Sequence, residues 1–167
     1  MAYEFYITIE GSKQGVFKGS AGSGDAKVAR AAHKQRIAGI KFLSETTSPR
    51  DTATGQASGK RIHKPISITK QWDAASPQLF QALVNNETLK SVLFEFVKTS
   101  QNGQDEVYHT IELTNASVSN IRSYLDLTDT SGDPYDAHEL EDVSFVFQKI
   151  KIENTEGKTS VVDSWQV

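Results

Sequence analysis

Apolar and polar residues alternate over most of the chain, which is the pattern of strands with one buried and one exposed face. The segments EFYITIE, VYHTIEL and TSVVDSWQV follow this pattern and are rich in β-branched and aromatic residues. The residues that would share the buried faces are Phe5, Ile7 and Ile9; Val107, Ile111 and Leu113; and Val161, Trp165 and Val167. The repeated period of two predicts a mainly β fold with antiparallel strands.

The segment RIHKPISITKQW follows the same period but contains a proline. Its two faces would be Ile62, Ile66, Ile68 and Trp72 on one side, and His63, Ser67, Thr69 and Gln71 on the other. Because proline cannot donate a hydrogen bond, Pro65 places this strand at a sheet edge, or marks a bulge or a strand start. Lys70 lies in the register of the apolar face near Asp73, so we expect an ion pair between them. Asp73 and Ser76 are expected to accept hydrogen bonds from backbone N–H groups at the following turn.

Two segments depart from simple alternation. In SVLFEFVK both faces are apolar apart from Glu95. In EDVSFVFQKIKIE the apolar face changes between Val143, Phe145 and Phe147 and the later Ile150 and Ile152. A strand that changes its buried face is bulged, or it passes from one packing layer to another. Both segments need apolar partners beyond a single sheet face, and a second subunit is one candidate.

The segment SPQLFQALVNN has the pattern of a helix. Ser76 suits the N-cap and Pro77 suits the first helical position. The apolar stripe and the helix exit are expected at Leu79 and Leu83, with Phe80 as a further candidate, and at Asn85 and Asn86. A second, shorter helix is predicted over DAKVARAAHKQR.

Three segments lack a strand pattern. Residues 18–25 have the composition of a flexible linker, and the segment DLTDTSGDPYDAHELED is acidic and rich in turn residues. Residues 44–60 form a long polar loop between two strands, and such loops in compact domains are usually functional or disordered. We expect this loop to reach a neighbouring subunit and to be held there by hydrogen bonds or an ion pair. The candidate interface residues are Ser48, Pro49, Arg50 and Asp51.

Composition narrows the possible functions. The chain has 167 residues, of which 37% are hydrophobic and 23% charged, and this fits a single soluble domain over residues 1–167. The net charge of −3 argues against nucleic-acid binding, and the lack of cysteine excludes disulfides, thiol catalysis and zinc–thiolate sites. The N-terminal MAYEFYITIE lacks the pattern of a signal peptide, and no segment approaches the ~20 apolar residues of a membrane-spanning helix. We therefore expect synthesis in a cytoplasm and no membrane insertion.

Several motifs suggest chemistry but are better explained as structure. GQASGKR has three residues between its glycines instead of the four of a phosphate-binding loop, and Arg61 stands where Ser or Thr would hold magnesium. The aspartates of residues 126–142 lack the alternating spacing of an EF-hand. The histidines also lack zinc-ligand spacing and are expected to be satisfied surface or interface residues: His33, His63, His109 and His138. We expect no cofactor and no metal.

The segment GKRIHKPISITKQWDAASPQLFQAL resembles the signature of the haemolysin-coregulated protein family, the tail-tube proteins of the bacterial type VI secretion system. The residues that carry the resemblance are His63, Pro65, Ile66, Ile68, Lys70, Asp73, Ser76, Pro77 and Leu79. The resemblance continues in LKSVLFEFVKT, YHTIELTNASVSNI and EDVSFVFQKI, and in the opening YEFYITIEGSKQGVF and the loop TSPRDTATGQASGKRIHKP. It covers nearly the whole chain, although GSAGSGDAKVARAAHKQR departs from the family pattern.

The resemblance implies a compact two-sheet β-barrel with one flanking α-helix. It also implies homohexameric rings that stack into a hollow tube, with a contractile sheath, a spike protein and effector proteins as partners. Effectors would lie in the lumen, and the tube protein would be assembled in the cytoplasm and then secreted without a signal peptide. A polar lumen would be built from outward strand faces such as Ser67, Thr69 and Gln71, or Thr110 and Glu112.

We expect a structural subunit and not an enzyme. His63 and Lys70 are seven residues apart in one predicted strand, so they would be about 23 Å apart, too far to serve one reacting centre. One alternative is a monomeric small-ligand or carbohydrate-binding β-barrel, which explains the strands but not the signature spacing. Another is a toxic enzyme with a catalytic domain after the tube domain, for which we expect no room after Val167.

Overall fold

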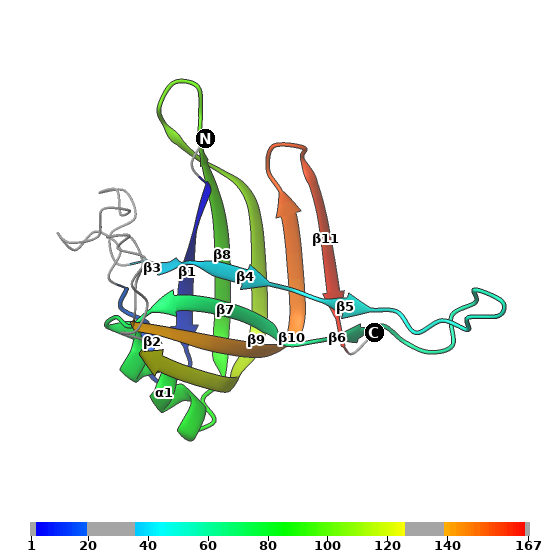
Figure 1. Cartoon of the computed structure of the whole chain (residues 1–167), viewed down its shortest axis with the longest axis horizontal. Coiled ribbons are helices and arrows are strands. Elements are labelled where there is room, and N and C mark those ends of the chain that lie inside the picture. Colours follow the sequence, from blue (N-terminus) through cyan, green and yellow to red (C-terminus); the bar gives the residue numbers. More distant parts are fainter. Residues whose placement is uncertain (1–2, 20–35, 126–138, 166–167) are drawn as a thin grey trace.

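The computed structural model describes residues 3–19, 36–125 and 139–165, which form eleven strands and one helix. The strands are β1 (Tyr3–Gly11), β2 (Gly15–Val16), β3 (Ile37–Gly39), β4 (Lys41–Leu43), β5 (Thr46–Thr47), β6 (Ile62–His63), β7 (Ile66–Gln71), β8 (Leu89–Thr99), β9 (Asp105–Leu125), β10 (Glu139–Asn154) and β11 (Thr159–Ser164). The helix α1 (Ala75–Val84) lies at one end of the strands (Figure 1). The predicted mainly β fold is confirmed.

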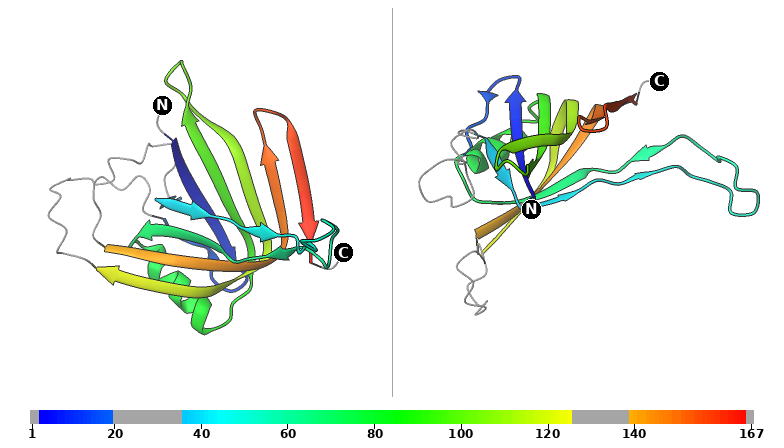
Figure 2. Two further views of the ribbon diagram at one scale, coloured as in Figure 1. Left: turned by 45° about the vertical axis from the view of Figure 1, so that its right-hand side comes forward. Right: turned by 90° about the horizontal axis from the view of Figure 1, so that it is seen from above.

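Nine of the strands form one antiparallel sheet that closes on itself. Their order is β2-β1-β8-β9-β10-β7-β4, with β11 paired to β10 and β3 paired to β1. Only Ile40 separates β3 from β4, and these two short strands pair with β1 and β7 respectively. The two ends of the sheet therefore meet, and the strands form a barrel of two packed layers with α1 at one end (Figures 1 and 2). The predicted two-sheet barrel with a flanking helix is confirmed.

The longest strands, β9 and β10, run through both layers (Figure 1). The first half of β9 pairs with β8 and with the second half of β10, whereas the first half of β10 pairs with β7. Where β9 passes between the layers, Asn115 has a φ of 50°, a conformation that asparagine tolerates better than most residues. Opposite it, Phe147 and Ile150 are buried while Gln148 and Lys149 between them are exposed. The predicted change of buried face is confirmed.

A bulge reverses the faces at the start of β9. The register between β8 and β9 shifts at Tyr108, which is the extra residue of the bulge. Val107 therefore lies on the outer face, where it packs with the buried Tyr6 and Val97. The prediction that Val107 shares a face with Ile111 is wrong, because one extra residue inverts a period of two.

Inward-facing side chains of both layers fill the barrel. Phe94 and Phe145 are fully buried, with their ring centroids 6.2 Å apart in an edge-to-face contact. The predicted core positions that are buried include Phe5, Ile7, Ile9, Ile66, Ile68, Ile111, Leu113 and Val143. Ile62 and Trp72, predicted to share the buried face of β7, are instead 48% and 45% exposed. Both lie outside the ends of β7, where the barrel no longer covers them.

The helix α1 begins two residues earlier than the capping pattern predicts. Its N-cap is Ala74, whose side chain makes no capping hydrogen bond, so the prediction that Ser76 is the N-cap is wrong. Ser76 and Pro77 are the second and third helical residues. Asp73 Oδ1 accepts the Ala75 N–H at 2.9 Å and so replaces the expected cap. The Ser76 hydroxyl is used elsewhere, as described below.

The buried face of α1 consists of small and aliphatic residues. Ala75, Leu79 and Ala82 are buried, whereas Phe80 is 59% exposed, so the expected extension of the stripe to Phe80 is wrong. The two asparagines that follow end the helix as predicted, and Asn86 adopts a φ of 51°.

Three predictions fall wholly or largely outside the described residues. They are the second helix over residues 25–36, most of the linker over residues 18–25, and most of the acidic segment 126–142. The expectations for His33, His138 and Val167 also lie outside the described residues. Within the part of the chain that the structure describes, no helix has the length and apolar character needed to cross a membrane.

Candidate assembly surfaces

Residues 44–63 form an arm that stands away from the barrel (Figures 1 and 2). At its base β5 pairs with β6, and further out Arg50 forms an isolated bridge with Ala57. The tip is closed by Asp51, whose carbonyl oxygen accepts the Gly55 N–H at 2.7 Å. The long loop expected here is therefore an ordered hairpin. Its sequence lacks a strand pattern because both of its faces are exposed.

The residues predicted to contact a neighbouring subunit lie in this arm: Ser48, Pro49, Arg50 and Asp51. Three of them are exposed and Pro49 is half-buried. The Arg50 guanidinium donates to the Gly55 carbonyl oxygen at 3.3 Å, and Asp51 Oδ1 accepts the Ala53 N–H at 2.9 Å. These contacts stay within the arm, so the contact with a second subunit stays a prediction.

The arm is tied to β11 by five residues that we call the base latch: Arg61, His63, Phe147, Asp163 and Trp165. Asp163 Oδ2 lies 2.8 Å from Arg61 Nε and 2.7 Å from His63 Nε2, and Arg61 also donates to Asp163 Oδ1 at 3.1 Å. The His63 ring packs against the rings of Phe147 and Trp165, with centroids 5.3 and 5.2 Å away. The latch thus fixes the base of the arm against the barrel and its C-terminal strand.

The base latch also sets the charge state of its carboxylate. The hydrogen bond from Arg61 is the largest cause, and that from His63 the second, of a fall in the pKa of Asp163 from 3.8 to about 2. The same hydrogen bond raises the pKa of Arg61. His63 was expected to be a satisfied surface or interface histidine. It is satisfied, since its Nδ1 also lies 3.1 Å from Thr46 Oγ1, but its side chain is only 7% exposed.

A second group of charged residues is buried at the far end of β7. Lys70 is fully buried, and its Nζ lies 2.7 Å from Asp73 Oδ1 and 2.5 Å from Glu141 Oε1. Ser76 Oγ donates to Glu141 Oε1 at 2.8 Å and accepts the Asp73 N–H at 3.0 Å. We call these four residues the buried cluster. The predicted ion pair and the predicted backbone hydrogen bonds to Asp73 and Ser76 are confirmed.

The structure does not bring His63 and Lys70 together. The prediction that they share one strand is wrong, because Lys64 and Pro65 separate β6 from β7. Pro65 marks the start of β7 and not a sheet edge, since β7 pairs with both β4 and β10. His63 belongs to the base latch and Lys70 to the buried cluster. Of the remaining signature residues, Leu79 lies in the core and Pro77 is exposed in the first turn of α1.

Three important residues were missed by sequence reasoning. Glu141 shares the inward register of Val143 and Phe145 on β10, so a charged residue on an apolar face was the available signal. Arg61 was considered only as a departure from a phosphate-binding motif, and Asp163 only as a polar residue of the last strand. No local pattern joins these two residues, which are separated by 102 positions along the chain.

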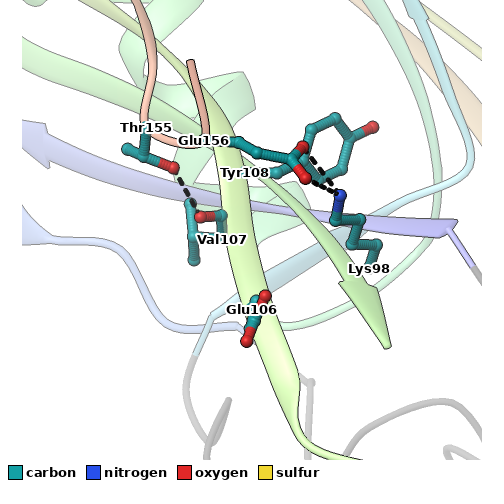
Figure 3. A pocket seen from close by; sticks show the side chains of 6 residues that line it. All are labelled: Lys98, Glu106, Val107, Tyr108, Thr155 and Glu156. Atoms are coloured by element: carbon teal, nitrogen blue, oxygen red, sulfur yellow. Dashed lines mark hydrogen bonds and ion pairs between the residues drawn. The ribbon is translucent and has the colours of Figure 1, made fainter. Parts of the chain in front are cut away.

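A surface pocket of about 320 Å³ lies beside the turn that joins β10 to β11 (Figure 3). Lys98 Nζ contacts both carboxylate oxygens of Glu156 at 2.7 Å and lies 5.4 Å from the centre of the Tyr108 ring. Thr155 Oγ1 donates to the Val107 carbonyl oxygen at 2.7 Å. Lys98, Glu156 and Thr155 thus make structural contacts between two hairpins. In the three described ranges, no three His, Asp or Glu side chains gather in a way that could hold a metal ion.

β11 presents an open sheet edge. It pairs with β10 on one side, and no strand in the described part of the chain pairs with its other side. Val161 and Val162, which point to opposite faces of β11, are 59% and 51% exposed. The prediction that Val161 lies on a buried face is therefore wrong for the single chain. An unpaired edge with apolar residues on both faces is a ready surface for pairing with another chain.

Known proteins share both the sequence and the fold. The family model described as "Type VI secretion system effector, Hcp" matches residues 6–153. The "Major exported protein" of Pseudomonas aeruginosa is 35% identical, over 99% of this chain and 97% of that protein. A crystal structure of an Hcp protein matches with a TM-score of 0.89 at 31% identity, over 98% of both chains. The secreted protein Hcp3 from Pseudomonas aeruginosa matches with a TM-score of 0.79 at 30% identity, over 99% of this chain and 100% of that chain.

The barrel, the flanking helix and these matches define a structural protein of the type VI secretion system. The chain belongs to the Hcp family, the haemolysin-coregulated proteins. The family predicted from the signature segment is confirmed.

Proposed function

We propose that this chain is a single-domain tube subunit that forms homohexameric rings, which stack into a hollow tube and carry effector proteins in the lumen. The tube is assembled in the cytoplasm and is then exported without a signal peptide. The observation that carries the proposal is the arm, an ordered hairpin that stands away from the barrel (Figure 2). Ordering a backbone costs roughly 1–2 kcal/mol per residue, and the exposed arm recovers little of this within its own chain.

Two further features support assembly into rings. The arm and the open edge of β11 are different surfaces, and contacts between unlike surfaces generate closed rings or continuing stacks. The apolar residues of β11 lose their exposure if a second copy covers them. The relatives named as exported and as secreted support export of this chain as well.

The partners of such a tube are those of the secretion system: a contractile sheath, a spike protein and effectors, with no nucleic acid and no membrane insertion. The role is structural and needs no catalytic group. The histidine and lysine that first suggest chemistry each have a structural use, His63 in the base latch and Lys70 in the buried cluster. The alternative of a monomeric ligand-binding barrel needs an internal cavity, whereas aromatic side chains fill this barrel.

A native mass measurement tests the proposal. Six copies of 18.4 kDa give a ring of roughly 110 kDa. We expect this mass from light scattering on a chromatography peak, and a monomer at micromolar concentration would refute the proposal. Replacing residues 47–58 by a short Gly/Ser turn is expected to leave a folded β-rich monomer, because the barrel core lies elsewhere. Rings that persist in electron micrographs of this variant would show that the arm is not needed for assembly.

A further inference from the structure

A groove of about 330 Å³ lies between α1 and the second half of β9. Its walls are apolar and consist of Trp72, Pro77, Phe80 and Ile121, and the buried carboxylates of Asp73 and Glu141 lie at its floor. The Trp72 indole N–H donates to the Leu140 carbonyl oxygen at 2.9 Å, which fixes the orientation of that ring. Two aromatic side chains at one groove, 45% and 59% exposed, mark a surface suited to a partner.

Two buried carboxylates meet at the floor of the groove. Among the described residues, Asp73 Oδ1 and Glu141 Oε1 both contact Lys70 Nζ. Glu141 Oε1 contacts both Lys70 and Ser76, whereas no residue in the described ranges donates a hydrogen bond to Glu141 Oε2. A carboxylate oxygen in a side chain that is 3% exposed is costly to leave without a donor. Glu141 Oε2 can therefore accept a hydrogen bond from a cationic group that enters the groove.

The combination of aromatic walls and a carboxylate floor fits a guanidinium group. Arginine stacks on aromatic faces and donates to carboxylates in a planar fork, which the more strongly hydrated ammonium group of lysine cannot do. We propose that the groove binds an arginine side chain, and that in the assembled protein this side chain is Arg50 from the arm of a second copy. The inference rests on the proposed function, since it names a contact within the tube.

Arg50 is the cation of the arm best placed for this contact. Arg61 is held by Asp163, and Lys64, just beyond the arm, is paired with Glu45 at 3.0 Å. Lys60 is exposed in the arm, but it carries the ammonium group that fits this groove less well. Arg50 lies far out on the arm and is exposed, and in the described part of the chain its one hydrogen bond is to the Gly55 carbonyl oxygen at 3.3 Å.

The arm and the groove lie at opposite ends of β7, which is six residues long, or about 20 Å. Figure 1 shows the arm and α1 on opposite sides of the barrel. One chain therefore cannot fill its own groove with its own arm. When the arm of one copy fills the groove of a second, the groove of the first copy and the arm of the second remain free. The same contact can therefore repeat from copy to copy around a ring or along a stack.

Cross-linking tests the contact directly, because the chain has no cysteine of its own. We would make Thr52→Cys in the arm and Ser123→Cys in the groove lining in separate proteins, which leaves Arg50, the apolar walls and the carboxylates of the groove unchanged. Oxidation of the mixed, assembled proteins is expected to give a disulfide-linked dimer of the two variants. The matched control is Asn102→Cys, an exposed residue in the turn between β8 and β9, which should cross-link to the Thr52 variant about tenfold less because a disulfide needs close Cα atoms.

Two added substitutions test the chemistry of the contact. Arg50→Gln in the arm variant and Phe80→Ala in the groove variant should each lower the cross-link yield by about tenfold, the loss of one desolvated cation–π contact. Both side chains are exposed, and circular dichroism checks that the proteins stay folded. A yield unchanged by both substitutions, or a preferred link to the Asn102 variant, would overturn the inference. Hexamers without the cross-link would refute the inference alone, whereas a protein that stays monomeric would refute the proposed function as well.

Discussion

The two ends of β7 carry groups of charged residues that differ chiefly in burial. In the buried cluster the side chains of Lys70, Asp73 and Glu141 are 0–4% exposed. In the base latch the side chains of Arg61 and Asp163 are 22% and 39% exposed. Water can replace a lost partner in the latch but not in the buried cluster. The comparison indicates that the buried cluster is required for folding, whereas the base latch sets the position of the arm.

The largest effect is expected from Lys70→Ala. Removing the one cation leaves two carboxylates buried together, and breaking a buried pair in this way typically costs about 3–5 kcal/mol. Urea denaturation at fixed protein concentration measures the loss. The matched control is Lys98→Ala, which removes a surface ion pair with Glu156 and should move the midpoint much less. Equal shifts for the two variants would show that burial does not separate the two kinds of site.

Ser76→Ala is expected to have an intermediate effect of about 1–2 kcal/mol. The substitution removes a hydrogen bond to the Glu141 carboxylate and the acceptor of the Asp73 N–H. The comparison variant is Ala74→Ser, at the true N-cap, where the backbone is helical with φ −63° and ψ −22°. Because an N-cap side chain usually acts from an extended backbone, this change should stay within about 0.5 kcal/mol. A clear stabilisation by Ala74→Ser would contradict the observed cap geometry.

The smallest effect on global stability is expected from Asp163→Asn, which weakens the base latch at a partly exposed site. The change should appear locally, as faster hydrogen exchange at the paired amides of β5 and β6, with little change in the unfolding midpoint. A large fall of the midpoint would mean that the latch, like the buried cluster, is required for folding.

The pH dependence of the latch follows from the lowered pKa of Asp163. A carboxyl whose pKa falls from 3.8 to about 2 on folding stabilises the folded state above its unfolded pKa, and this contribution is lost as the pH falls through about 2. The protection of the arm base should therefore stay constant from pH 7 to about pH 4 and decline between pH 4 and pH 2. Asp163→Asn should abolish that decline. Release of the arm near pH 6 in the wild-type protein would contradict this assignment.

Local patterns predicted what depends on neighbours in sequence. Alternation identified the inward residues of β1 and β7. The change of face in β10 indicated either a bulge or a passage between layers, and the structure has the passage. The ion pair of Lys70 with Asp73 was also predictable, because the two residues are three positions apart. The base latch was not, since Arg61 and Asp163 meet only after the whole barrel has formed.

Two predictions were wrong because contacts with residues distant in sequence override the local pattern. Serine is a common N-cap residue, but the Ser76 hydroxyl donates to the buried Glu141 carboxylate. Asp73 accepts the backbone N–H at the start of the helix instead. Trp72 and Phe80 have the size and apolarity of core residues, yet they lie outside the barrel beside the groove. Sequence alone cannot distinguish an apolar residue that packs in its own chain from one that is exposed in a single copy.

The passage of β9 and β10 through both layers has a mechanical consequence. These strands are 21 and 16 residues long and pair with each other over most of their length, so a hinge between the layers would have to break their hydrogen bonds. In the proposed tube, the barrel should therefore transmit an axial load as one rigid body, and the hydrogen bonds between its strands should share the force. The arm, joined to this body through β4, β7 and the base latch, is then the part of the subunit best able to absorb a change in spacing between neighbours under that load.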